Sequence, residues 1–137
     1  MSFSEDFLQN DGESVYDEKE LKEKIKICKE HIENGTTISS LEFLEETIEM
    51  CVDYDYVEDG LVLVNELLNI APYNSEAWHF KGILLNNSFV FEEAYQCFEK
   101  ALSLNPNDVE TYINKSIAED NLGMFEEALQ SLQTAFN

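Results

Sequence analysis

The sequence has no arginine, so lysine supplies all of its strongly basic side chains. Eight lysines stand against 29 aspartates and glutamates, which gives a formal net charge of −21 at pH 7. A surface of this sign repels phosphate backbones and anionic lipid headgroups, so nucleic acids and membrane surfaces are poor partners. Basic proteins or basic peptide segments are the natural complement. A second interpretation stays open, in which the acidity only keeps an elongated surface soluble.

The sequence also lacks long apolar runs. No stretch approaches the roughly 18 consecutive apolar residues of a membrane-spanning helix, and the first residues, MSFSED, have neither the basic nor the apolar region of a secretory signal. Cysteine is scarce, since Cys28, Cys51 and Cys97 form an odd set without close spacing. Such cysteines fit a reducing compartment. We therefore expect a soluble, cytoplasmic protein.

Proline is scarce as well, and its two positions reveal a repeat. Pro72 and Pro106 lie 34 residues apart, and residues 41–74, 75–108 and 109–137 align at the same interval. The matching positions hold Leu44, Trp78 and Tyr112; Val57, Phe91 and Phe125; Gly60, Ala94 and Ala128; Val64, Phe98 and Leu132; and Leu67, Ala101 and Ala135. A fixed period of this length marks a solenoid, in which each unit buries its apolar face against its neighbours.

Each repeat is expected to form a helical hairpin. The apolar spacing predicts helices near residues 40–53, 56–70, 75–87, 91–104, 109–121 and 125–136. Proline cannot continue the helix before it, and the asparagine, serine or aspartate that follows caps the next helix. The sequence therefore predicts an all-α solenoid of about three hairpins.

These residues resemble the tetratricopeptide repeat, whose signature combines Trp, Gly, Tyr, Ala, Phe and Pro at set spacings. The middle unit carries it most fully, with Trp78, Gly82, Ala94, Phe98, Ala101 and Pro106. The third unit keeps Tyr112, Ser116, Gly123, Phe125, Ala128 and Ala135. The resemblance covers residues 41–137 and implies a right-handed superhelix of antiparallel helix pairs. In that family the concave face, lined by the first helices, usually binds an extended peptide or a partner's helix.

The outer units depart from the pattern. Unit 1, residues 41–74, is divergent: it has Ile48 where its successors have small residues, and Gly60 where they have alanine. We expect the two substitutions to face each other and conserve the volume. Unit 2 spans residues 75–108. Unit 3, residues 109–137, is incomplete, so we expect it to continue in a longer parent protein or to pair with another copy.

The N-terminal segment does not match the repeat. Residues 17–38 are expected to form a capping helix and a hinge, with Asp17 as the N-cap and Gly35 after the last turn. The apolar stripe of this helix, Leu21, Ile25, Cys28 and Ile32, would cover the first unit. Residues 1–16 are expected to be an acidic, mobile tail. The alternative for the tail is a docking segment that uses its aromatic residues.

The resemblance assigns a set of positions on the first helices to the groove. They are Glu42, Glu45, Glu49, Val52 and Asp53 in unit 1; Glu76, His79, Ile83, Asn86 and Asn87 in unit 2; and Glu110, Ile113, Ile117, Asp120 and Asn121 in unit 3. Family members that grip the acidic C-termini of large chaperones use lysine, arginine and asparagine at such positions. Here only Asn114 resembles one of those residues, which argues against that partner.

A groove that is acidic at one end and apolar further along suits a peptide with lysine or arginine and aliphatic anchors. Asn86, Asn87 and Asn121 could pair with the backbone of the peptide, because amides both donate and accept hydrogen bonds. The alternative is that this surface is idle and the partner docks elsewhere.

Signs of an enzyme or a metal site are weak. His31 and His79 have no cysteine or second histidine at ligand spacing, and residues 53–59 lack ligands that a calcium loop needs. The sequence has no phosphate-cradling glycine loop and no recognisable nucleophile with its base. We therefore expect no catalytic residue, no metal and no cofactor. The prediction is a non-catalytic scaffold or adaptor for a basic or amphipathic segment. The alternatives are a structural oligomer formed through residues 129–136 and a targeting module of a longer multidomain protein.

Overall fold

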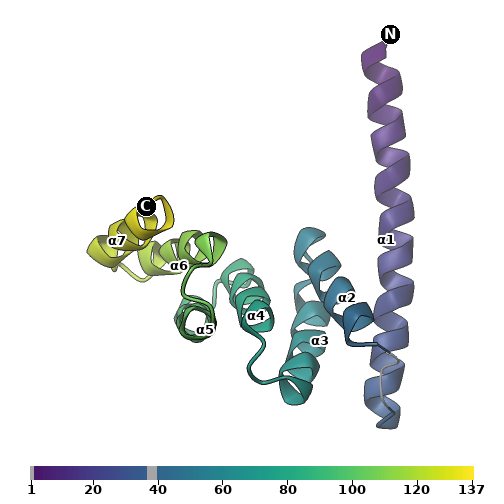
Figure 1. Ribbon diagram of the computed structural model, residues 1–137. Coiled ribbons are helices and arrows are strands. Elements are labelled where there is room, and N and C mark those ends of the chain that lie inside the picture. The colour runs from purple at the N-terminus through teal and green to yellow at the C-terminus, as the bar shows by residue number, and fades with distance from the viewer. Residues whose placement is uncertain (1, 37–39) are drawn as a thin grey trace.

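The computed structural model describes residues 2–36 and 40–137, with side chains from residue 18 onward. This part of the chain contains helices and no strand (Figure 1). The helices are α1 (Ser2–Asn34), α2 (Leu41–Asp53), α3 (Val57–Ile70), α4 (Ser75–Asn87), α5 (Phe91–Leu104), α6 (Val109–Asn121) and α7 (Phe125–Ala135). The predicted all-α class is confirmed, and α2 to α7 form the three expected hairpins.

The first helix of every hairpin begins at a side-chain cap. Ser40, Asn74 and Asp108 lie at the 34-residue interval, and each accepts a hydrogen bond from the backbone N–H three residues later, at 3.3, 3.1 and 3.4 Å. Such caps satisfy one of the amide groups that a helix start leaves without a partner. Because the caps recur at the repeat interval, α2, α4 and α6 begin at the same position of their units.

The two prolines anchor the aromatic residue of the unit that follows. The indole Nε1 of Trp78 donates to the carbonyl oxygen of Pro72 at 2.9 Å, and the hydroxyl of Tyr112 donates to that of Pro106 at 3.0 Å. Each bond ties the first helix of a unit to the loop that precedes it. The aromatic residue and the proline therefore recur together.

Helix α1 covers the first hairpin. Leu21, Ile25 and Cys28 are buried in the same core as Leu44 of α2 and Leu63 of α3. The structure begins this helix at Ser2, whereas we expected a start at Asp17. Part of the expected hinge, residues 37 and 38, lies outside the described residues, as do the side chains of the expected tail.

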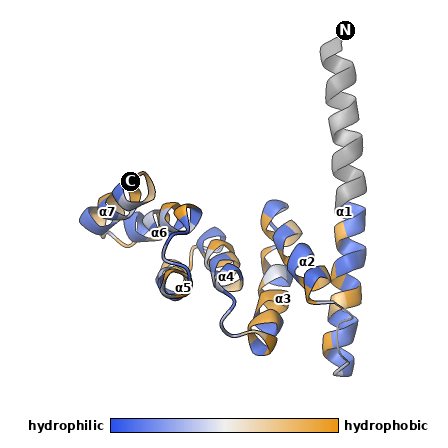
Figure 2. Ribbon diagram, in the orientation of Figure 1, coloured by the Kyte–Doolittle hydropathy of each residue, from blue (hydrophilic) through white to orange (hydrophobic). Residues whose placement is uncertain are grey.

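The first helices form the inner side of a curved row (Figure 1). Helix α2 contacts α4, and α4 contacts α6, whereas the second helices α3, α5 and α7 do not contact one another within the described chain. A row whose first helices touch while its second helices spread apart is concave on the first-helix side. Apolar residues are concentrated in α3, between the helices it packs against (Figure 2).

Candidate functional site

Carboxylates from consecutive units gather on the inner face. Burial and the charges of Glu49, Glu45 and Asp108 together raise the pKa of the Glu76 carboxyl above its usual range, with burial the largest cause. These side chains come from α2, α4 and the cap of α6. Asn74 Nδ2 donates to Glu45 Oε1 at 3.4 Å, which holds one of them in place. We call Glu45, Glu49, Glu76 and Asp108 the inner carboxylate cluster.

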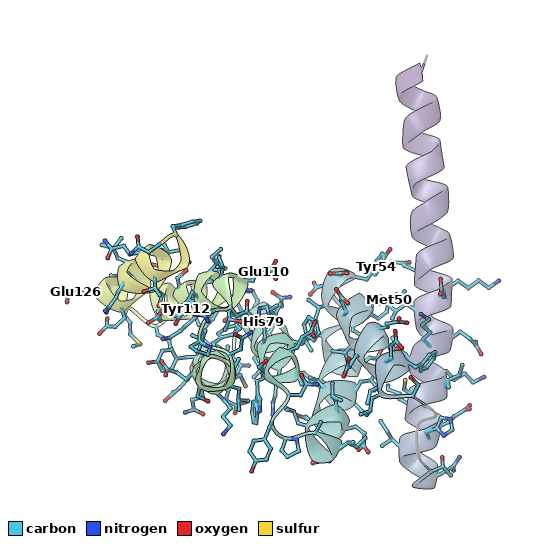
Figure 3. The ribbon with its side chains drawn as sticks, in the orientation of Figure 1. Met50, Tyr54, His79, Glu110, Tyr112 and Glu126 are labelled. Atoms are coloured by element: carbon cyan, nitrogen blue, oxygen red, sulfur yellow. The ribbon has the colours of Figure 1, made fainter. Side chains whose placement is uncertain are left out.

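Four further acids from the predicted set are exposed. They are Glu42, Asp53, Glu110 and Asp120. Figure 3 shows the side chain of Glu110 reaching away from α6 into the inner side of the bend. The inner face therefore extends its negative charge beyond the cluster, and no described lysine makes an ion pair with any of these four residues.

The predicted apolar positions differ in exposure. Val52, Ile83 and Ile113 are half-buried, and Ile83 packs both against the core shared by α1 to α4 and against a second core formed by α4, α5 and α6. Ile117 is exposed and lines a shallow hollow together with Asp120 and residues of α7. The apolar part of the inner face is therefore shallow, and Ile117, its last residue, lies next to α7.

His79 lies between α4 and α6 and is 5% exposed (Figure 3). Asn114 Nδ2 lies 3.0 Å from Nε2 of the ring, and the ring stacks on Phe80 with centroids 6.0 Å apart. Burial lowers the pKa of His79, against an opposing effect of Asp108, whose Oδ2 lies 4.0 Å from Nδ1. A neutral ring that accepts from Asn114 fits this site, so His79 joins two helices and is not an exposed groove residue.

The three asparagines predicted to contact a peptide backbone have internal partners. Asn86 is buried and donates through Nδ2 to the carbonyl oxygen of Asn114 at 3.1 Å. Asn87 donates to Asp55 Oδ1 at 3.4 Å, and Asn121 donates to the carbonyl oxygen of Ile117 at 2.8 Å. Asn86 therefore joins α4 to α6. Asn87 and Asn121 remain on the surface, and the Nδ2 of each donates one hydrogen bond within the chain.

One member of the cluster was missed by sequence reasoning. Asp108 precedes α6, and the predicted groove positions were taken only from within the first helices. The available signal was the cap register, because Asp108 and Asn74 occupy the same position one repeat apart. A cap at this position lies directly before the first turn of α6 and so borders the same inner face.

The described residues also limit other chemistry. Among the described side chains, residues 18–36 and 40–137, no group of three His, Cys, Asp or Glu residues is placed to hold a metal ion. In the same ranges no helix combines the length and the apolar character that crossing a bilayer requires. Burial is the largest cause that raises the pKa of Cys51 to about 12 and that of Cys97 to about 11, which makes both thiols poor nucleophiles at neutral pH.

Two comparisons of the sequence bear on the family. Two tetratricopeptide repeat profiles match, one over residues 75–108 and the other over residues 97–130. A search of curated proteins with the sequence finds no match. The resemblance inferred from the repeat is therefore confirmed for residues 75–130.

Solved structures resemble a large part of this chain. MamA from Desulfovibrio magneticus RS-1 aligns with a TM-score of 0.66 at 11% identity over 72% of this chain and 55% of that one. MamA of AMB-1 gives 0.64 at 23% identity, over 71% and 57%. The yeast Sti1 TPR2B domain, solved as a complex with pHsp70, gives 0.65 at 22% identity, over 69% and 75%. At these identities the likeness shows the fold alone, and this chain spans a little over half of the MamA chains.

Proposed function

For a chain whose residues 75–130 carry tetratricopeptide repeats within an all-α solenoid, we propose a non-catalytic scaffold. Its partner is a basic or amphipathic segment of another protein, held along the inner face formed by α2, α4 and α6. The observation that carries the proposal is the inner carboxylate cluster, in which side chains from successive units lie near Glu76 and add to the effect of burial in raising its pKa.

Electrostatic repulsion within the cluster favours a cationic ligand. Like charges held near Glu76 disfavour its ionised form, and a bound ammonium or guanidinium group would offset that repulsion. The formal net charge of −21 adds an attractive field for a basic segment and speeds its encounter. A segment with two or three cations spaced along one side fits carboxylates supplied by successive helices.

The apolar members of the inner face supply the second part of the recognition. Ile83 and Ile113 are half-buried beside the acidic positions, and Ile117 is exposed. Aliphatic side chains on the ligand would cover these residues and remove apolar surface from water. The ligand is therefore proposed to be amphipathic, with its basic residues toward α2 and its aliphatic residues toward α6.

One of the similar solved structures, yeast Sti1, contains a bound partner. That TPR2B domain was solved as a complex with pHsp70. For this chain we propose a basic segment and not an acidic peptide terminus, because Glu45, Glu49 and Glu76 would repel carboxylates.

The test is the binding of a fluorescein-labelled lysine–leucine peptide, followed by fluorescence anisotropy. The Glu45→Lys/Glu49→Lys variant should weaken binding by about tenfold or more, since it replaces attraction with repulsion at the cluster. Glu92→Lys/Glu126→Lys changes the net charge equally on the outer helices and should weaken binding far less. Equal losses in the two variants would mean that net charge, and not the inner face, determines binding.

A further inference from the structure

The second helix of unit 3 carries an exposed apolar stripe. Phe125, Leu129 and Leu132 follow at steps of four and three residues, which places them on one side of α7, and Phe136, four residues further on, is the C-cap of this helix. Phe125 is 66% exposed, Leu129 is 59% exposed and Phe136 is 75% exposed, while Leu132 is half-buried between two shallow hollows. We call these four residues the α7 stripe.

The same repeat positions are covered elsewhere in the row. Leu61 of α3 and Tyr95 of α5 correspond to Leu129, and both are half-buried against the first helix of the next unit. Lys115 of α6 lies over the Tyr95 ring, with its Nζ 5.5 Å from the centroid. The α7 stripe is therefore a surface on which this fold packs a helix.

The stripe is also free of charge. Residues 128–137 contain no aspartate, glutamate or lysine, in a sequence where 27% of residues are charged. Two copies that each carry a net charge of −21 repel each other wherever acidic surfaces meet. Apart from Asp120, which lines the hollow beside Phe125 and Leu129, this surface lets two copies approach with few like charges meeting.

We propose that the α7 stripe packs against the α7 stripe of a second copy, with the two helices antiparallel about a two-fold axis. A two-fold interface must be self-complementary, so that residue i contacts j while j contacts i. The stripe meets this condition because it reads Phe, Leu, Leu, Phe with symmetric spacing. Phe125 then lies opposite Phe136 of the second copy, and Leu129 lies opposite Leu132 of the second copy.

Charge and shape favour the antiparallel direction. Glu126 and Glu127 stand at the start of α7, and antiparallel packing keeps those of the two copies at opposite ends of the contact. Parallel packing would bring the four carboxylates together. The hollows beside Leu132, one bordered by Phe136 and the other by Phe125, lie where the aromatic rings of the second copy would pack.

This contact lies at the end of the row and leaves the inner face open. If the proposed function holds, a dimer would present two inner faces and bind a ligand with two basic segments more tightly than one. The dimer itself does not depend on that function. It is expected to strengthen with salt, which screens the repulsion between copies, whereas the peptide complex is expected to weaken.

Sedimentation equilibrium over a concentration series tests the dimer. The chain should shift from monomer to dimer as its concentration rises toward about 1 mM, the range expected of a small interface. Leu129→Lys, at an exposed position, should raise the dissociation constant by about tenfold or more, because it places a charge in the contact. Val62→Lys is the control, since Val62 is an exposed aliphatic residue on α3. A monomer at every concentration and salt would overturn the proposal, as would equal effects of the two variants.

Disulfide trapping tests the antiparallel geometry. A mixture of Phe125→Cys and Phe136→Cys should form a covalent heterodimer on oxidation, because the two positions lie opposite each other. Phe125→Cys alone should not cross-link, since the two copies of this residue would be about 16 Å apart along the helix axis, beyond the roughly 7 Å that a disulfide spans between Cα atoms. The native Cys28, Cys51 and Cys97 are buried. Rapid cross-linking of Phe125→Cys alone, or none in the mixture, would overturn the arrangement.

Discussion

At the scale of single residues, the contact between α4 and α5 depends on the missing side chain of Gly82. A Cβ added there would overlap the ring of Phe98, which is fully buried. Gly60 in unit 1 is less tightly enclosed, since a Cβ would lie 3.0 Å from Leu84 and 3.1 Å from Cys51. The expected partner of Gly60, Ile48, lies in the same core but not nearest to the glycine. The expected crowding around Gly60 is therefore present, but its nearest contacts are Leu84 and Cys51 and not Ile48.

Gly82→Ala should destabilise the chain by about 1–3 kcal/mol, because the ring of Phe98 must move to admit the methyl group. Urea unfolding followed by the fluorescence of Trp78 measures the change. Adding Phe98→Leu should recover part of the loss, since unit 3 combines Ser116 with Leu132 at these two positions. A fully stable Gly82→Ala variant would show that the overlap is relieved without cost.

The pKa of His79 gives a second residue-scale prediction. Burial lowers this pKa below its usual value, so the unfolded chain binds the proton more readily than the folded chain. The stability that comes from the neutral ring should be present above about pH 6.5 and lost as the pH falls through that value. The unfolding free energy of the native chain should therefore fall relative to that of His79→Gln between pH 7.5 and pH 5. A difference that stays constant would contradict the assignment of a buried, neutral ring.

At the scale of elements, the turn inside each hairpin uses a left-handed residue at the repeat interval. Asp55, Phe89 and Gly123 have φ angles of 61°, 63° and 78°. Only glycine adopts this conformation without steric cost. Phe89 is 80% exposed and its ring meets Phe91 edge-on at 6.0 Å, a contact that compensates part of the strain.

Phe89→Gly should leave the fold unchanged. It should raise the unfolding free energy by up to about 1 kcal/mol, because it removes the steric cost of the left-handed backbone. The matched change in unit 3, Gly123→Ala, should destabilise the chain by a similar amount. Thermal unfolding of both variants measures these two changes in stability. A large loss of stability in Phe89→Gly would mean that the contact with Phe91 outweighs the strain.

The sequence predicted α2 to α7 to within one residue at each end, because caps and prolines mark the starts and stops of these helices at a fixed interval. It failed at the start of α1. Asp17 followed by Glu20 matched a capping pattern, yet the structure continues the helix back to Ser2. Local capping signals identify possible starts, and residues 1–16 offer no repeat by which a start could be checked.

At the scale of the whole molecule, the curvature of the row decides which residues form a surface. The resemblance to the tetratricopeptide repeat placed the inner face on the first helices, and the contacts between α2, α4 and α6 agree with that. It could not foresee that Asn114 would cover His79 and Asn86, because that contact depends on side chains of the next unit. The acidic character of the face was predictable from sequence, since Glu45, Glu49 and Glu76 occupy first-helix positions.

The inner face is proposed to bind a basic, amphipathic segment. The most direct measurement is a two-dimensional amide NMR spectrum of the labelled chain as a lysine–leucine peptide is added. If the peptide lies along the inner face, the largest shifts should fall on α2, α4 and the start of α6, around the inner carboxylate cluster. Shifts that fall mainly on α3, α5 or the α7 stripe, or no shifts at millimolar peptide, would contradict it.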